Sequence, residues 1–545
     1  MEKRLLSGDE AVALAARDTG IALGTGYPGT PSTEILEAFG ALGGSAQWAP
    51  NEKVALEVGL GAAFGGGRAL VTMKHVGLNV AADPLFTAAY TGVTGALVVV
   101  TADDPGMASS QNEQDNRRYA IAAGLPMLSP ADPQEAYDYF FRAVELSERW
   151  SLPVLFRMTT RVCHSKALVT SRATPMTPRA PSFVRDIPGR VMVPAFARPA
   201  HRKLRAKLAD MAAFGETSDL HTVTEGSRDL GIVTDGVCAL HAAEASPGAS
   251  FFKIGLVHPL PIERLRTFAA GVKRCQVIEE GDPVIADALR AAGIAVESKP
   301  EMFRFGELDV GRVRRILARD LSTEPPLPKG KPPELCAACP YHPVFAALRK
   351  LDCIVAGDIG CYTLGVMEPY RALDTCVAMG ASIGVGLGLR HVLPADQARR
   401  VVSIIGDSTF IHSGVSGLME MVYNPPKLGH VIIVLDNGIT AMTGQQEHPG
   451  TGRTLEHEAT GKISIEGLAR AMGIDTTIID PFANPAGFAT LLAEKLAAPL
   501  LSLIVARRPC VLAAADIRGW EKAAEATRAA QACAGAACGA VPEDA

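Results

Sequence analysis

The sequence predicts a multidomain α/β protein built on parallel sheets. At 545 residues the chain is too long for one hydrophobic core. Two proline-rich breaks, at residues 174–189 and 322–333, divide it. Around these breaks, short strand-like runs alternate with alanine-rich helical stretches, which is the pattern of parallel α/β domains.

Strand-like and helix-like segments alternate through the first 321 residues. Runs rich in β-branched and apolar residues predict strands at 69–73, 96–101, 153–157, 230–234 and 275–279. The stretch 54–64 predicts a helix, and the charged stretch 198–216 predicts an exposed helical insertion. We therefore expect an N-terminal α/β domain over residues 1–178 and a smaller α/β middle domain over residues 190–321.

The segment after the second break has the clearest α/β pattern. Residues 401–405, 431–435 and 500–506 predict buried strands. They belong to a third predicted domain, residues 334–512. The remaining residues, 513–545, are alanine-rich with little apolar periodicity, so we expect a weak helix or a disordered tail there.

Two polar turns follow neighbouring strands of the third domain. GDS (residues 406–408) comes after the first strand, and DNG (residues 436–438) comes after the second. In a parallel sheet both turns lie at the same carboxyl edge, where α/β proteins bind ligands. Carboxylate, amide and carbonyl oxygens are ligands of the kind that Mg²⁺ uses to hold a diphosphate. The pair resembles the GDG…N signature of thiamine diphosphate enzymes, although two ordinary β–α turns could have the same residues.

A thiamine diphosphate enzyme also needs a carboxylate beside the aminopyrimidine ring, in a second α/β domain. Glu52 is the candidate, because it lies where the helix 54–64 begins, near the edge of the N-terminal sheet. Glu57 on the same helix is its main competitor. The structural alternative is a glutamate that only favours the positive end of the helix dipole.

Longer motifs, colinear along the chain, resemble those of 2-oxoacid:ferredoxin oxidoreductases. The N-terminal domain contributes GYPGTPSTEI (26–35), NEKVALEVGLGAAFGG (51–66) and VTMKHVGLNVAADPL (71–85). The middle segment contributes KIGLVHPLP (253–261), CQVIEEGDP (275–283) and GELD (306–309). The third domain contributes GDIGCYTLG (357–365), GDSTFIHSG (406–414) and LDNGITAMTGQQ (435–446). Over about residues 5–512 the chain most resembles the large, thiamine-diphosphate-binding subunits of indolepyruvate ferredoxin oxidoreductases.

The resemblance implies a set of site residues. The implied catalytic residues are Glu52, which would activate thiamine diphosphate, Thr30, which would contact substrate, and the acid–base candidates His75 and His412. A lone histidine is more often structural than catalytic. The implied cofactor-binding residues are Gly406, Asp407, Ser408, Asn437, Ile439 and Thr443. Among these, Asp407, Asn437 and the carbonyl of Ile439 would bind Mg²⁺.

Four of the eleven cysteines match cluster ligands of the wider family. They are Cys336 and Cys339 in a C-x-x-C, Cys361 in a Gly-Cys-Tyr turn, and Cys510 after the last strand. Four thiolates that converge can hold one [4Fe–4S] cluster. A zinc site, which usually pairs two C-x-x-C units, and four unrelated buried thiols are the alternatives.

The end of the chain departs from the family pattern. Related large subunits carry a C-terminal ferredoxin-like domain with eight cluster-binding cysteines. Here residues 513–545 contain only Cys533 and Cys538, and two cysteines cannot hold a cubane cluster. We expect a degenerate tail in place of that domain, and electrons that leave by the proximal cluster alone.

The expected reaction is the oxidative decarboxylation of an arylpyruvate to an arylacetyl-CoA, with coenzyme A as co-substrate. The expected partners are a small second subunit, in a dimer of heterodimers, and an electron acceptor that is ferredoxin or a flavin- or NAD-linked protein. The alternative is a non-oxidative 2-oxoacid decarboxylase or carboligase without iron–sulfur clusters. A third possibility is a degenerate subunit that binds a partner without catalysis.

Bulk composition limits the other functional classes. A net charge of −5 and the lack of a dense basic run argue against nucleic-acid binding. The sequence contains no run of about 18 uninterrupted apolar residues, so we expect no membrane span. The N-terminus lacks the apolar segment of a signal peptide. Eleven cysteines in 545 residues are too sparse for a secreted disulfide scaffold, so we expect a cytoplasmic protein.

Overall fold

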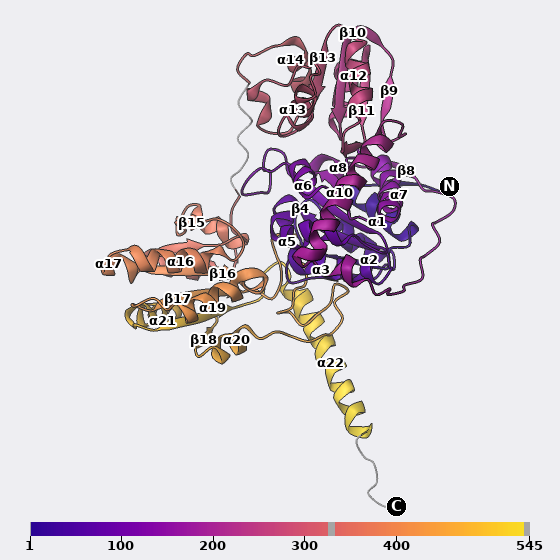
Figure 1. The fold of residues 1–545 in the computed structure, drawn as a ribbon. Helices are drawn as coiled ribbons and strands as arrows, with labels where there is room; N and C mark the ends of the chain where they lie inside the picture. Colours follow the sequence, from indigo (N-terminus) through magenta and orange to yellow (C-terminus); the bar gives the residue numbers. More distant parts are fainter. Residues whose placement is uncertain (1, 325–332, 539–545) are drawn as a thin grey trace, which may run out of the picture. The chain divides into compact units, whose positions relative to one another are not determined.

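Two β-sheets of mainly parallel strands, one in each of two units of the chain, confirm the predicted α/β fold class (Figure 1). The structure is a computed structural model that describes residues 2–324 and 333–538. The first unit is Met1–Pro326 and the second is Leu327–Ala545. The three domain boundaries expected from the sequence stay a prediction.

A seven-stranded sheet lies at the centre of the first unit, with strand order β12-β6-β7-β5-β4-β2-β3. Its strands are β2 (Leu23–Gly26), β3 (Ala46–Trp48), β4 (Ala69–Lys74), β5 (Leu97–Asp103), β6 (Met127–Leu128), β7 (Val154–Thr159) and β12 (Leu256–His258). All pairs are parallel except β12 with β6. Every residue of β5 and β7 is buried, as their continuous apolar runs predict.

Helices alternate with these strands along the chain. They are α1 (Gly8–Asp18), α2 (Thr33–Ala41), α3 (Glu52–Phe64), α4 (His75–Val80), α5 (Ala82–Thr91), α6 (Arg117–Ala123), α7 (Pro133–Trp150) and α8 (Thr160–His164). Strands β1 (Lys3–Leu6) and β8 (Ala167–Thr170) form a separate antiparallel ribbon. The caps explain where helices begin: Asn51 accepts a hydrogen bond from the Val54 N–H at the start of α3, and Ser7 forms a capping box with Glu10 at the start of α1.

The middle segment forms a four-stranded sheet with order β13-β10-β11-β9. Its elements are α9 (Ile187–Arg190), α10 (Pro194–Gly215), β9 (Thr222–Thr224), β10 (Ser227–Asp235), α11 (Cys238–Ala245), β11 (Ala249–Ile254), α12 (Ile262–Ala270), β13 (Cys275–Ile278), α13 (Val284–Ala291), η1 (Glu301–Arg304) and α14 (Val310–Ala318). Helix α10 confirms the predicted helical insertion. The motif at 253–261 is divided between two sheets, because β11 ends at Ile254 and β12 extends the seven-stranded sheet.

Buried charges join these two sheets at the carboxyl ends of their strands. The Arg117 guanidinium lies 2.6 Å from the Glu279 carboxylate, which follows β13. Arg157 of β7 lies 2.7 Å from Asp103 at the end of β5, and 3.5 Å from Asp235 at the end of β10. Each of these side chains is at most 3% exposed, so the network is desolvated.

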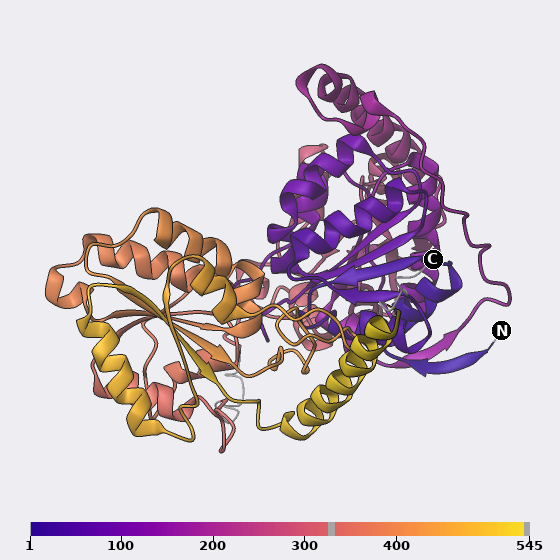
Figure 2. The same cartoon turned by 90° about the horizontal axis from the view of Figure 1, so that it is seen from below.

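The second unit contains an entirely parallel six-stranded sheet with order β15-β14-β16-β17-β19-β18 (Figure 2). Its strands are β14 (Ile354–Gly357), β15 (Thr375–Cys376), β16 (Val401–Gly406), β17 (His430–Asp436), β18 (Asp475–Ile479) and β19 (Leu501–Arg507). The strands β16, β17 and β19 lie within two residues of their predicted positions.

Helices cover both faces of this sheet. The elements are α15 (His342–Lys350), η2 (Cys361–Val366), α16 (Ala381–Val392), α17 (Ala395–Ala398), α18 (Asp407–Thr409), the π-helical turn η3 (Phe410–Gly414), α19 (Val415–Tyr423), α20 (Ile465–Ala471), α21 (Pro485–Ala497) and α22 (Ala514–Cys538). Alternate strand residues point to opposite faces. Ile404 and Ile433 pack with α15 and α21, whereas Ile405 and Ile432 pack with α16, α19 and α20.

The C-terminal segment forms a helix, α22, rather than a disordered tail. Its first turns belong to the fold, since Ile517 is 1% exposed and packs against Ile439. The last residues, 539–545, and the side chains of Cys533 and Cys538 lie outside what the structure describes. Within residues 2–324 and 333–538, no helix has both the length and the apolar character needed to cross a bilayer.

Candidate functional site

The two polar turns of the second unit lie side by side at the carboxyl edge of its sheet. Gly406 pairs with Leu435 in neighbouring parallel strands, so the residues that follow leave the sheet together. The Gly438 N–H donates a hydrogen bond of 2.8 Å to Oδ2 of Asp407. Asp407 is 3% exposed and Asn437 6% exposed, and the Oδ1 of Asn437 accepts a hydrogen bond from the Ile439 N–H at 3.1 Å.

The remaining residues expected around the cofactor belong to the same region. The Thr440 hydroxyl donates to the Ser408 hydroxyl at 2.9 Å, which joins the two turns. Ile439 is buried, and the Thr443 hydroxyl donates to the side-chain carbonyl of Gln446 at 2.5 Å. Gly406 ends β16 and Ser408 lies in α18, and both adjoin the loop that contains Asn437, Ile439 and Thr443.

A cavity of about 410 Å³ opens beside these turns. Its wall includes Asp407, Asn437, His448, Arg453, Lys462 and Ile517. Burial and the neighbouring Asp407 raise the pKa of Asp436, which also lines the cavity, to about 6, although Arg507 opposes this. The Asp407 carboxylate, the Asn437 amide oxygen and the Ile439 carbonyl form a donor set that fits a divalent cation, and the basic wall fits an anionic diphosphate.

His448 and the start of α22 are parts of this cavity that the sequence did not indicate. The Nε2 of His448 lies 3.3 Å from Oδ2 of Asp407, and its Nδ1 accepts a hydrogen bond from the Gly450 N–H. The Trp520 ring stacks on His457, with ring centroids 3.9 Å apart. These contacts join segments 41 and 63 residues apart, and no local motif marks them.

The four predicted cysteines gather near this edge. The Cys510 N–H donates a hydrogen bond of 3.0 Å to the Asn437 carbonyl. Cys510, which follows the last strand, therefore lies beside the turn that contains Asn437. The Cys339 N–H donates to the Cys336 carbonyl at 2.9 Å. Burial, with smaller contributions from Cys336, Cys361 and Cys510, raises the pKa of the Cys339 thiol to about 11, although a hydrogen bond with the Tyr341 backbone opposes this. A charge has this effect only at short range, so these three sulfurs lie near Cys339.

The spacing of the cysteine sulfurs bears on the zinc alternative. Thiolates that share one zinc ion, each about 2.3 Å from it, lie roughly 4 Å apart. Within the described residues, no three of these four sulfurs lie within 4.8 Å of one another. A cluster of four irons and four sulfides is larger than one ion and holds its thiolates farther apart. These thiols are therefore spaced more widely than the ligands of one zinc ion.

The first unit holds Glu52 at the start of α3. Glu52 is 5% exposed and lies against Gly77 of α4, where a Cβ would come within 2.7 Å of its Oε1. Glu57 is exposed and pairs with Lys53. Lys74 lies close enough for Glu52 to raise its pKa, although burial lowers that pKa more strongly. Glu52 is therefore the buried member of the two candidates.

The other predicted catalytic residues differ in accessibility. Thr30 is partly exposed in the loop between β2 and α2. His75 is fully buried: its Nε2 lies 3.1 Å from the Asn112 carbonyl, and its Nδ1 has no hydrogen-bond partner among the described residues. In the second unit, His412 lies in the π-helical turn η3, and its Nδ1 is 2.6 Å from the Ser413 hydroxyl. The catalytic roles of all three stay predictions.

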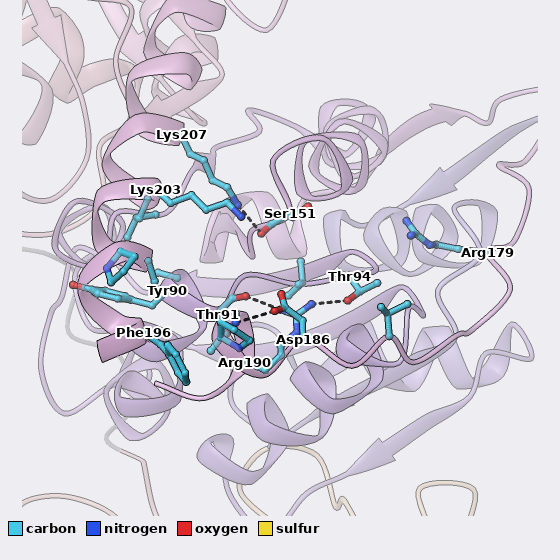
Figure 3. Close-up of a pocket in the computed structure, with 18 residues that line it drawn as sticks. Tyr90, Thr91, Thr94, Ser151, Arg179, Asp186, Arg190, Phe196, Lys203 and Lys207 are labelled. Carbon is cyan, nitrogen blue, oxygen red and sulfur yellow. Dashed lines mark hydrogen bonds between the residues drawn. The ribbon is translucent and has the colours of Figure 1, made fainter. Parts of the chain in front are cut away.

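A second cavity, of about 710 Å³, lies in the first unit between α5 and the α9–α10 segment (Figure 3). The Arg190 guanidinium donates to the Thr91 carbonyl and the Thr94 hydroxyl, both at 2.6 Å. The Lys207 ammonium donates to the Ser151 carbonyl at 3.3 Å, and burial lowers its pKa to about 8. These cations hold the inserted helices against the seven-stranded sheet's layer, and none of the described candidate residues lines this cavity.

Two protein-family models match the two regions of the chain described above. Residues 14–182 match the family described as "Pyruvate flavodoxin/ferredoxin oxidoreductase, thiamine diP-bdg". Residues 358–506 match "Thiamine pyrophosphate enzyme, C-terminal TPP binding domain". The fold resembles a solved 2-oxoglutarate:ferredoxin oxidoreductase from Magnetococcus marinus, with a TM-score of 0.50 and 18% identity over 58% of this chain and 65% of that chain.

The fold and the two matched domains define a thiamine-diphosphate-dependent 2-oxoacid oxidoreductase. The chain is 38% identical to the indolepyruvate oxidoreductase subunit IorA of Archaeoglobus fulgidus, over 94% of this chain and 87% of that protein. It is 37% identical to the subunit IorA of Pyrococcus abyssi, over 94% of this chain and 86% of that protein. The chain belongs to the family of indolepyruvate oxidoreductase IorA subunits.

Proposed function

We propose that the protein catalyses the oxidative decarboxylation of an arylpyruvate, such as indolepyruvate, to the corresponding arylacetyl-CoA. One 2-oxo acid anion and one coenzyme A would give one acyl-CoA, one CO₂, one proton and two electrons. Thiamine diphosphate, when bound, supplies an electron sink for the carbon that loses CO₂. Membership of the IorA family supports this substrate class.

We assign the cofactor-holding roles to residues of both units. Asp407, Asn437 and the Ile439 carbonyl would bind Mg²⁺ and thereby hold the diphosphate, since the donor set fits this ion. Glu52 would exchange a proton with the pyrimidine ring, a role that suits a carboxylate buried against a glycine. Thr30 would contact the substrate.

The observation that carries the oxidative assignment is the hydrogen bond between the Cys510 N–H and the Asn437 carbonyl. It makes one proposed cluster ligand and one proposed Mg²⁺ ligand direct neighbours. We therefore propose one [4Fe–4S] cluster bound by Cys336, Cys339, Cys361 and Cys510. Electrons would leave the diphosphate site through this cluster.

The proposed cluster needs an electron acceptor, and the relatives are named as subunits. We propose a small second subunit, assembled with this chain as a dimer of heterodimers. The acceptor would be ferredoxin or a flavin- or NAD-linked partner. Copurification of a tagged chain with the second subunit, followed by mass measurement of the intact complex, tests this assembly.

Iron and acid-labile sulfide analysis of the anaerobically purified complex tests the cluster. We expect about four irons per chain and an EPR signal after reduction with dithionite. Both should be lost in Cys361→Ala and Cys510→Ala. Cys353→Ala is the matched control, because Cys353 is a half-buried thiol of the same unit outside the quartet. If iron is absent and an aldehyde forms from the 2-oxo acid, the non-oxidative decarboxylase replaces this proposal.

A further inference from the structure

We propose that Asp9, Glu34 and His164 form a binding site for a divalent transition metal of the Zn²⁺ type in the first unit. One ligand atom from each of these three side chains lies within 4.8 Å of the other two. The site is independent of the proposed Mg²⁺ and cluster sites, whose residues all lie in the second unit.

Three helices bring these side chains together. Asp9 lies in the first turn of α1, Glu34 in the first turn of α2, and His164 at the end of α8. Gly8 allows the close approach of α1 to α8, since a Cβ at this position would lie 2.1 Å from the Val162 carbonyl oxygen. The two carboxylates at helix N-termini are electrostatically favourable, but the fold still has to offset their mutual repulsion.

Asp9 provides the second observation that points to a ligand. It is 1% exposed, and neither of its carboxylate oxygens has a hydrogen-bond partner of normal geometry among the described residues. Burial and the Glu34 charge raise its pKa, and the Cys163 thiol beside it only partly opposes this shift. A buried, unpaired carboxylate is costly unless a cation or a proton neutralises it. Glu34 and His164 are exposed, so an ion can enter from solvent.

The donor set selects the class of metal. One imidazole nitrogen and two carboxylate oxygens suit Zn²⁺ and similar ions, whereas Mg²⁺ and Ca²⁺ prefer oxygen ligands alone. A bound ion would join the start of α2 to α1 and α8. The loop before α2 contains Thr30 and is already fastened by a hydrogen bond from the Gly29 N–H to the Thr33 hydroxyl at 3.0 Å. The ion would therefore stabilise the substrate-facing loop.

Metal analysis of the full chain tests this site. The protein is stripped with EDTA, dialysed against Zn²⁺, and its zinc content is measured by mass spectrometry. Glu34→Gln and His164→Gln should each bind one equivalent less than the wild type. His201→Gln, which removes another exposed histidine of the same unit, should match the wild type. Zinc held by the cysteines contributes equally to all variants, so the difference isolates this site. Equal zinc contents in all variants would overturn the proposal.

For a second variant, Asp9→Asn, the expected change in the thermal midpoint differs with and without zinc. Without zinc, Asp9→Asn should not lower the thermal midpoint, because it replaces a buried carboxyl whose oxygens have no hydrogen-bond partner of normal geometry among the described residues. With zinc, the same variant should lose part of the metal-dependent rise that the wild type shows. An anomalous-scattering peak between the three side chains in zinc-soaked crystals would agree with this. A midpoint that falls equally with and without zinc would show that Asp9 has a purely structural role.

Discussion

At the scale of single residues, the most consequential proposal is that Glu52 exchanges a proton with the cofactor's pyrimidine ring. Glu52→Gln keeps the size of the side chain but removes the proton exchange, so we expect turnover of the 2-oxo acid to fall roughly 10²–10⁴-fold. The measurement is the steady-state rate of the complex at saturating thiamine diphosphate. Glu57→Gln, on the same helix but exposed, is the control and should retain wild-type activity. Unchanged turnover in Glu52→Gln would favour the non-catalytic subunit.

Gly77 provides an independent test of where the Glu52 carboxylate must lie. A Cβ at residue 77 would come within 2.7 Å of both Cγ and Oε1 of Glu52. Gly77→Ala should therefore displace the carboxylate and reduce kcat roughly tenfold or more, since small misplacements of catalytic groups are costly. Gly61→Ala is the control, because an added Cβ there has no neighbour within 4 Å. Equal rates in the two variants would contradict the assigned position.

The sequence predicted some of these residue contacts and missed others for a physical reason. Asp407 and Asn437 follow neighbouring parallel strands, and the sheet geometry alone brings them together. His448 lies beside Asp407 because an irregular loop folds back onto the turn. A loop path has no period or composition from which such a contact can be read. The burial that separates Glu52 from Glu57 likewise depends on the packing of α4.

At the scale of elements, α22 is a structural part of the diphosphate cavity. Ile517→Ala removes a buried side chain that contacts Ile439, and large-to-small changes of this kind cost about 2–5 kcal/mol in protein cores. We expect the helix to detach and the apparent Kd for thiamine diphosphate to rise at least tenfold, with a smaller change in kcat at saturation. Isothermal titration with Mg²⁺ and thiamine diphosphate measures this.

The control for α22 is Arg518→Ala, an exposed position of the same helix. It should bind thiamine diphosphate as the wild type does. An unchanged Kd in Ile517→Ala would mean that the helix does not support the cavity. This helix also shows the limit of composition-based prediction, because its alanine-rich sequence has weak periodicity; among the side chains that the structure describes, the buried ones, Ile517 and Ala524, lie in its first half. The three-residue strand β12 was missed for a similar reason: its pairing with β6 depends on tertiary contacts.

At the scale of the whole molecule, buried charges couple the N-terminal sheet to the middle sheet. Glu280, next to Glu279 of this network, is buried, and its Oε2 has no hydrogen-bond partner among the described residues. Burial raises its pKa to about 7, although Arg157 and Lys299 oppose the shift. The folded protein therefore holds this proton at pH values where the unfolded chain, with a usual pKa near 4.5, has lost it.

The sign of the resulting pH dependence follows from this difference. Stability is greatest below the unfolded pKa and falls as the pH rises from about 4.5 to about 7, by roughly 3 kcal/mol. Glu280→Gln should remove this loss, so its unfolding midpoint should exceed that of the wild type at pH 8 but not at pH 4. Thermal unfolding at a series of pH values measures the difference. Parallel pH profiles for the two proteins would contradict the assigned burial.

The stacking of Trp520 on His457 makes the fluorescence of this tryptophan a probe of the second unit. The chain has only three tryptophans. Trp150 is buried in the N-terminal sheet's layer, and Trp48 belongs to β3 of the same unit. Trp520 is therefore the one indole of the second unit, and its ring lies over the loop beside the diphosphate turns. Its fluorescence should report cofactor occupancy in real time, without any added dye, in a chain where Trp48 and Trp150 are replaced by phenylalanine.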